Sequence, residues 1–100
     1  MIRHVVLLKF KEETPAHTQA TLEQSFAGLT KTISFIQRLE WGVNTSAEGL
    51  NKGFTHCFLI TFKSEKDRTT YLEHPDHKAF VSILMPVLEE PFVIDYWAQE

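Results

Sequence analysis

Four stretches of the chain have the hydrophobic pattern of β-strands. Residues 1–10 are rich in valine, isoleucine and leucine, which is typical of a largely buried strand. Residues 54–63 alternate, with phenylalanine, histidine and isoleucine on one face and threonine, cysteine and leucine on the other. Residues 36–43 and 92–98 predict two further strands. Together these stretches provide the strands of one small sheet.

The segment between the first two strands predicts an amphipathic helix. Thr14 and Pro15 form a start signal, because a hydroxyl can cap a helix and proline needs no amide hydrogen bond at that position. Apolar side chains then follow at helical spacing: Leu22, Phe26, Leu29 and Ile33. One face of this helix should therefore pack on the sheet.

Two shorter helices are predicted between the third and fourth strands. Ser64 begins a capping-box-like start for a helix through Tyr71. Pro75 stops that helix, because the residue before a proline avoids helical angles. Asp76 can then cap a third helix over residues 77–87.

The order of the elements is strand, helix, strand, strand, helix pair, strand, which is the ferredoxin-like split βαβ plan. We expect residues 1–100 to form a single α+β domain, with a four-stranded antiparallel sheet and its helices on one face. The other face of such a sheet is bare and apolar, so it needs a partner. Two copies packed sheet to sheet would form a dimeric α+β barrel.

Composition and charge exclude several classes of function. The net charge is −3 and the basic residues are scattered, so nucleic acid is not an expected partner. No apolar run approaches the roughly 20 residues of a membrane span, so no membrane role is expected. Cys57 is the single cysteine and cannot form an internal disulfide, which favours a cytoplasmic location.

Several short motifs resemble the stress-responsive dimeric α+β barrel family. The most specific is a tyrosine ahead of a His-Pro-x-His element, found here from Tyr71 to His77. Shorter matches occur along nearly the whole chain: Ile2 to Lys11, Trp41-Gly42, Gly53 to His56 and Ile94 to Tyr96. The resemblance implies a homodimer, with a cavity in each subunit between the sheet and its helices.

The resemblance does not determine the activity. The family includes plant stress proteins, bacterial proteins with no assigned role, and cofactor-independent polyketide cyclases similar to olivetolic acid cyclase. One fold can therefore host several functions. Two hypotheses follow: a non-catalytic dimer with a stress-related, ligand-binding or assembly role, or a cofactor-free enzyme that acts on a small carbonyl compound.

The enzyme hypothesis depends on His77 and Tyr71. His77 is expected in the first turn of the third helix, where the helix dipole disfavours the imidazolium and keeps the ring neutral. Tyr71 supplies a phenol that can donate a hydrogen bond to a carbonyl or a developing enolate. By analogy with the cyclases, His77 would remove a proton next to a carbonyl, with Tyr71 assisting, and neither a metal nor a cofactor is required.

His4 and His56 each share a strand face with apolar residues, so both are candidates to line or polarise the same interior. Phe26 and Phe80 are expected to face the sheet and could set the size of a small, hydrophobic ligand site. In the alternative interpretation all these side chains have structural roles: His77 and Tyr71 fix the helix break, the two strand histidines are satisfied core groups, and the phenylalanines pack.

Two further sites are weak candidates. His74 and His77 have a spacing that could bind zinc or nickel, but no cysteine or second acidic group is clearly near, so no metal site is expected. Cys57 lies on the opposite strand face from His56, so a Cys-His nucleophilic pair is not expected, and we predict a small buried thiol.

Overall fold

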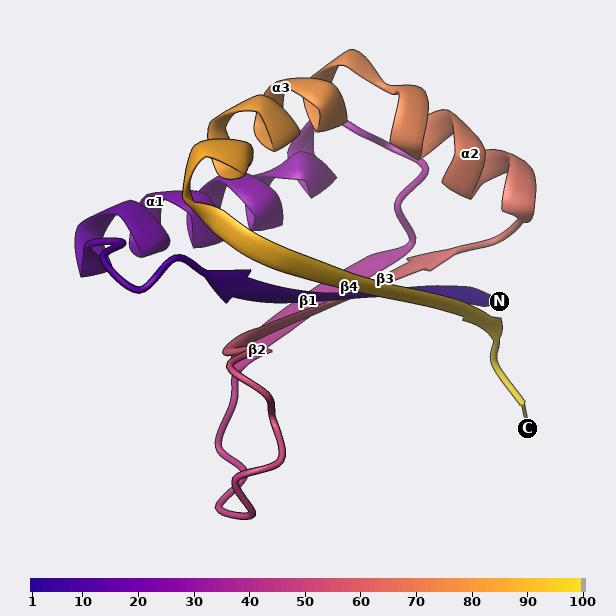
Figure 1. Cartoon of the computed structure of the whole chain (residues 1–100). Helices are drawn as coiled ribbons and strands as arrows, with labels where there is room; N and C mark the ends of the chain where they lie inside the picture. Colours follow the sequence, from indigo (N-terminus) through magenta and orange to yellow (C-terminus); the bar gives the residue numbers. More distant parts are fainter. Residues whose placement is uncertain (100) are drawn as a thin grey trace.

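A computed structural model of the protein describes residues 1–99. The elements follow the predicted order (Figure 1). The strands are β1 (Ile2–Phe10), β2 (Arg38–Val43), β3 (His56–Phe62) and β4 (Leu88–Trp97). The α-helices are α1 (Ala16–Ala27), α2 (Glu65–Glu73) and α3 (Pro75–Leu84), and short 3-10 turns, Gly28–Lys31 and Met85–Val87, follow α1 and α3.

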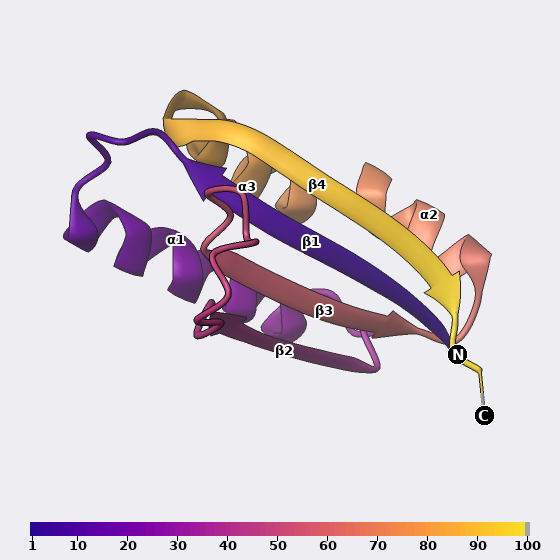
Figure 2. The same ribbon diagram turned by 60° about the horizontal axis from the view of Figure 1, so that its bottom comes forward.

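The four strands form one antiparallel sheet in the order β2-β3-β1-β4, as Figure 2 shows. The two central strands are β1 and β3, and His4 of β1 lies opposite Ile60 of β3. On its other side, β1 pairs with β4, which places His4 directly opposite Asp95. Pro91 is tolerated in β4 because this strand lies at the edge of the sheet. The predicted ferredoxin-like fold is confirmed.

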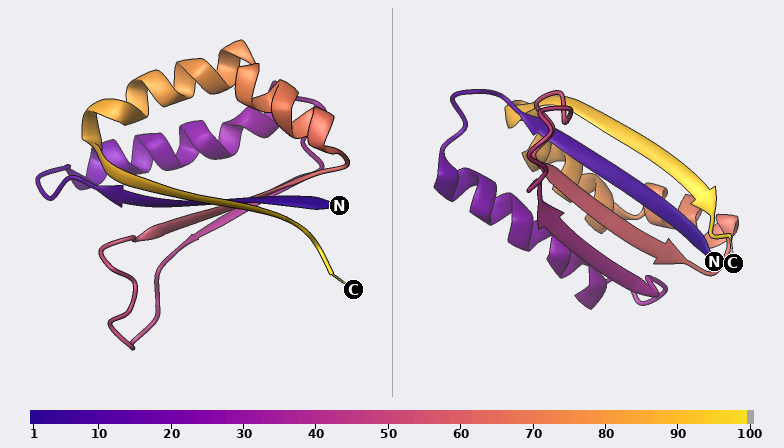
Figure 3. Two further views of the ribbon diagram at one scale, coloured as in Figure 1. Left: turned by 45° about the vertical axis from the view of Figure 1, so that its right-hand side comes forward. Right: turned by 90° about the horizontal axis from the view of Figure 1, so that it is seen from below.

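All three helices cover one face of the sheet (Figure 3). The strand alternation determines which side chains point toward them: every second residue of β1 from Ile2 to Leu8 is buried, and β3 follows the same rule. The buried apolar core joins this face to the helices: Ile2, Val6, Leu8, Leu22, Phe26, Leu29, Ile33, Ile36, Phe58, Ile60, Phe62, Tyr71, Phe80 and Leu84.

The other face of the sheet carries no helix (Figures 1 and 3). Large apolar side chains of β4, including Phe92, Ile94 and Tyr96, are about half exposed. Cys57 is also exposed, so the prediction of a buried thiol is wrong for the single chain. The reason is that Cys57 alternates with the buried His56 and therefore points to the helix-free side. The β2–β3 connection extends from the sheet on this same side.

The helix starts match the sequence in part. The Ser64 hydroxyl accepts a hydrogen bond from the Asp67 amide at 3.1 Å, as predicted for the N-cap of α2. The cap of α3 is His74 rather than Asp76: its ring nitrogen accepts from the Asp76 amide at 3.0 Å, and Pro75 is the first helical residue. The Thr14 hydroxyl makes no hydrogen bond in the described structure, so it does not cap α1.

Candidate functional site

A cavity of about 310 Å³ lies between the helix layer and strands β1 and β4. We call it the histidine cavity, because His4 of β1 and His77 of α3 both line it, together with Tyr71 of α2 and Asp95 of β4. Its other walls are largely apolar and include Val6, Leu8, Phe26, Phe80, Leu84 and Leu88. A small apolar cavity with a few convergent polar groups is the usual form of a ligand site.

Tyr71 is the most buried polar side chain in this cavity. The residue is 0% exposed, and its hydroxyl has no hydrogen-bond partner among residues 1–99. Burial raises the pKa of the phenol above its ordinary value, so the hydroxyl stays protonated at neutral pH. An unpaired buried hydroxyl costs free energy, which a ligand with an acceptor atom could recover.

His77 lies beside Tyr71, with the two ring centres 4.5 Å apart. Pro75 starts α3 abruptly, so His77 falls in the first turn and its Nδ1 reaches the carbonyl oxygen of Leu72 at 3.2 Å. A carbonyl can only accept, so Nδ1 carries the proton and donates it, which leaves the lone pair on Nε2. The free nitrogen is therefore the basic one.

Burial is the main reason why the pKa of His77 lies below its ordinary value. The hydrogen bond to Leu72 opposes this shift, and the nearby His4 and His74 rings add to it. The direction agrees with the neutral ring expected from the helix dipole, although the main cause is burial. A neutral imidazole with a free Nε2 can accept a proton.

His4 is held by a chain of two hydrogen bonds to the Asp95 carboxylate. Its Nδ1 lies 2.6 Å from Oδ1 of Asp95, and Oδ2 of Asp95 lies 2.7 Å from Nη1 of Arg68. The β1–β4 register places His4 and Asp95 opposite each other, and Arg68 and Tyr71 lie three residues apart on one face of α2. The sequence interpretation missed Asp95 and Arg68, because alternation does not reveal which strands are neighbours.

His56 does not line the histidine cavity, although it lies on the same face of the sheet. It pairs in register with Leu8, four residues along β1 from His4, a separation of about 13 Å. Its Nε2 lies 2.7 Å from the Glu23 carboxylate, and its Nδ1 lies 2.7 Å from the Thr55 hydroxyl. Both ring nitrogens are therefore engaged.

Phe26 and Phe80 line the cavity, as predicted from their helical positions. Their ring centres are 4.7 Å apart, and Phe26 also stacks on Phe58 at 3.9 Å. The rings of Phe26 and Phe80 are part of the cavity wall and limit what fits in it. Among residues 1–99, no group of three or more histidine, cysteine, aspartate or glutamate side chains is arranged to hold a metal ion.

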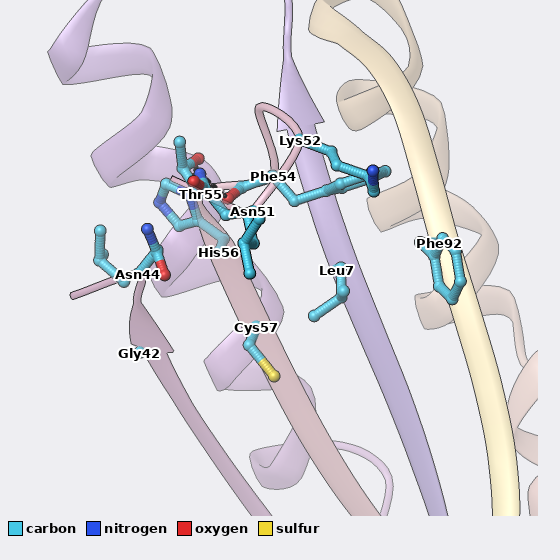
Figure 4. Close-up of a pocket in the computed structure, with 12 residues that line it drawn as sticks. Leu7, Gly42, Asn44, Asn51, Lys52, Phe54, Thr55, His56, Cys57 and Phe92 are labelled. Carbon is cyan, nitrogen blue, oxygen red and sulfur yellow. Dashed lines mark hydrogen bonds between the residues drawn. The ribbon is translucent and has the colours of Figure 1, made fainter. Parts of the chain in front are cut away.

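A second hollow, about 410 Å³ in volume, lies on the helix-free side of the sheet (Figure 4). The β2–β3 connection borders it with Asn51, Lys52 and Phe54, and side chains of the sheet such as Leu7 and Phe92 form its floor. His56 and Cys57 also line this hollow, but both ring nitrogens of His56 are already engaged, by Glu23 and Thr55. The histidine cavity is therefore the candidate site.

The sequence profile of the stress responsive A/B barrel domain family matches residues 2–98. A stress-response A/B barrel domain-containing protein of Arabidopsis thaliana is 34% identical over 95 residues, which are 95% of this chain and 87% of that protein. Olivetolic acid cyclase of Cannabis sativa is 25% identical over 95 residues, which are 95% of this chain and 94% of the cyclase.

Solved structures show the same fold. A crystal structure of an Arabidopsis thaliana protein has a TM-score of 0.93 and 32% identity, and the match covers 100% of this chain and 97% of that chain. A dimeric protein of unknown function with a ferredoxin-like fold, from Bacteroides fragilis, has a TM-score of 0.76 and 26% identity, with 95% and 93% coverage. This dimeric neighbour supports self-association of the present chain.

Proposed function

The chain belongs to the stress-responsive A/B barrel domain family, and we propose that it acts as a homodimer in which each histidine cavity binds a small carbonyl compound. The observation that carries this proposal is the unpartnered Tyr71 hydroxyl, buried beside the free Nε2 of His77. A purely structural pair would be expected to satisfy its buried polar atoms within the protein. Here a donor and an acceptor are left free at the same end of an apolar cavity.

We propose proton abstraction next to the carbonyl as the reaction of this site. Tyr71 donates a hydrogen bond to the carbonyl oxygen, and His77 Nε2 takes a proton from the adjacent carbon. The electrons of the broken C–H bond form the enolate double bond, and the negative charge develops on the oxygen that Tyr71 holds. The protonated His77 can then return its proton to the product. The relationship to olivetolic acid cyclase, named as a cyclase, supports chemistry at this site.

The helix-free face supports the proposed homodimer. Phe92, Ile94 and Tyr96 leave apolar surface in contact with water in the single chain. A second copy would cover this surface, since a domain of this size still leaves much apolar surface in contact with water. No helix within residues 1–99 has both the length and the apolar composition needed to cross a bilayer. A cytoplasmic location remains a prediction from the single cysteine.

A second candidate is a dimer that binds a ligand or assembles with partners without catalysis. The contacts of Phe26 favour it, because its ring stacks on Phe58 and packs at a tilt against Phe80, as expected of a packing role. Under this hypothesis, the protein turns over none of the compounds that it binds.

A thermal-shift screen against small phenolic, β-keto and acyl compounds tests the proposal. A ligand at 100 times its dissociation constant adds roughly 2.7 kcal/mol to the free energy of unfolding. We expect His77→Ala and Tyr71→Phe to weaken the effect of a hit, and His17→Ala on the exposed side of α1 to leave it unchanged. For a compound that is turned over, His77→Ala should reduce the rate by about 10²- to 10⁴-fold.

The controls separate the two candidate functions. A hit that depends on Tyr71 and His77 but shows no turnover favours the non-catalytic dimer. A screen without hits, or hits that all three variants bind equally, contradicts a ligand site in the histidine cavity.

A further inference from the structure

Arg68, Asp95 and His4 form a chain of charged contacts that joins α2, β4 and β1. The Arg68 and Asp95 side chains are partly exposed, at 21% and 25%, whereas the His4 side chain on the cavity wall is 5% exposed. The distances, 2.7 Å and 2.6 Å, are those of charge-assisted hydrogen bonds. The chain therefore connects a partly exposed arginine of α2 with the inner wall of the histidine cavity.

The Asp95 carboxylate contacts two groups: the Arg68 guanidinium and the His4 ring. Arginine is always protonated, so Arg68 compensates the negative charge of Asp95 at every pH of interest. His4 then has no uncompensated carboxylate beside it, and it can serve Asp95 as a neutral ring that donates its Nδ1 proton. Without Arg68 the same carboxylate would favour a doubly protonated imidazolium.

Apart from Asp95 and Arg68, the groups that surround His4 carry no charge. Its neighbour in β3 is Ile60, which is apolar, and the Tyr71 ring stands edge-on at 5.9 Å with a neutral hydroxyl. His77 of α3 is the remaining titratable group, and burial keeps it neutral. Among residues 1–99, no side chain or backbone group makes a hydrogen bond to Nε2 of His4.

We propose that Arg68 is a positioning residue for the histidine cavity: by holding Asp95, it keeps His4 neutral with the proton on Nδ1. His4 Nε2 is then a hydrogen-bond acceptor at the wall of the cavity, beside the donor Tyr71 and the base His77. This inference rests on the proposed function of the cavity, although its test requires no substrate. A chain of this kind sets the tautomer of a histidine through a group that never touches the ligand.

Nitrogen-15 NMR of the histidine side chains in the intact protein tests this inference, with His4 assigned by the loss of its signals in His4→Asn. In the natural sequence at pH 7, His4 should show the neutral tautomer with the proton on Nδ1. Arg68→Gln should raise the ratio of protonated to neutral His4 by roughly tenfold. Arg68→Lys retains the positive charge and should keep His4 mostly neutral.

Arg38→Gln is the matched control. It also removes one positive charge, but from β2, which lies at the opposite edge of the sheet from β4. It should leave the ratio of protonated to neutral His4 unchanged. The inference is overturned if His4 in the natural sequence carries its proton on Nε2 or is already doubly protonated. It is also overturned if Arg68→Gln has no effect, or no greater effect than Arg38→Gln. The first two outcomes need no variant at Arg68, so a variant that fails to fold does not prevent the test.

The two proposals can fail separately. A neutral His4 that responds to Arg68, in a protein that binds none of the screened compounds, supports the positioning role and contradicts the proposed ligand site. Ligand binding that depends on Tyr71 and His77, with His4 insensitive to Arg68, gives the opposite result.

Discussion

His4 and His56 occupy comparable places in the sheet, but their surroundings differ. Each lies on a central strand, each is 4% exposed, and each has a carboxylate within 2.7 Å. The imidazole of His56 is satisfied at both nitrogens, by Glu23 and Thr55, and it is enclosed by the rings of Phe10 and Trp41. His4 is held at one nitrogen only, and its other side faces a cavity.

The difference shows how a buried histidine can be interpreted. Burial and a carboxylate partner are common to both, so neither property identifies a functional group. What distinguishes the His4 end is incomplete hydrogen bonding: the buried Tyr71 hydroxyl has no partner in the described structure, and the hydrogen bonds of His4 and His77 there use only Nδ1. A buried polar group is normally paired, so the unpaired hydroxyl indicates a place for a ligand. The His56 end is complete and therefore structural.

The largest expected effect is a loss of stability at the His56 end of the sheet. His56→Ala should lower the free energy of unfolding by about 2–3 kcal/mol, because it leaves the partly buried Glu23 carboxylate without its partner. Urea denaturation at fixed protein concentration measures this change. The double variant with Glu23→Ala should recover part of the loss, because the unpaired charge is then removed as well.

Ligand affinity is the second property that should distinguish the His56 end of the sheet from the His4 end. Any compound that binds in the histidine cavity should bind to His56→Ala with its affinity nearly unchanged, provided that the variant is folded. A loss of affinity comparable to that in Tyr71→Phe would show that the two ends of the sheet are not separate in function.

The pH dependence of His77 provides a second, smaller test. Burial lowers its pKa below the ordinary value of 6.5, so the ring should be neutral at pH 7 and titrate only in more acidic solution. The unfolded chain binds this proton more tightly than the folded one. The contribution of His77 to stability is therefore full above pH 6.5 and is lost as the pH falls through the lowered value.

Proton NMR of the histidine rings follows this titration directly. His77→Asn should remove the corresponding signal and reduce the loss of stability in acid. If His77 titrates at or above pH 6.5, the ring is not kept neutral by burial, and the assignment as a base loses its support. Turnover of a confirmed substrate should decrease along the same titration curve.

The smallest expected change in stability is at Tyr71. Tyr71→Phe removes a hydroxyl that has no partner in the described structure, so the free energy of unfolding should stay the same or increase by up to about 1 kcal/mol. Thermal or urea unfolding of the variant measures it. A clear destabilisation would reveal a hydrogen bond made in solution, and with it a structural role for the hydroxyl.

The fold could be predicted from the sequence because its signals are local. Alternation in residues 54–63 correctly gave the buried face of β3, and the proline at position 75 gave the break between the second and third helices. The predicted helix cap was wrong where two nearby side chains could both cap the same helix. His74 caps α3 in place of Asp76, because the extended backbone before Pro75 already places the ring beside the Asp76 amide.

The candidate site could be predicted only in part. The sequence indicated His4, Tyr71 and His77, and the structure brings these three together. The roles of Asp95 and Arg68 require knowledge that β4 pairs with β1 and that α2 packs above this pair. Nor could alternation separate His4 from His56, because it gives the face of a strand and not the position along it.

The pairing of the first and last strands also determines when the site can exist during synthesis. His4 is translated before Asp95, which follows 91 positions later and must pair with it across β1 and β4. A nascent chain that lacks β4 has the edge of β1 exposed and His4 without its carboxylate. The histidine cavity is therefore completed only after β4 has been synthesised and has paired with β1, so a nascent chain that lacks β4 has no complete site for a ligand.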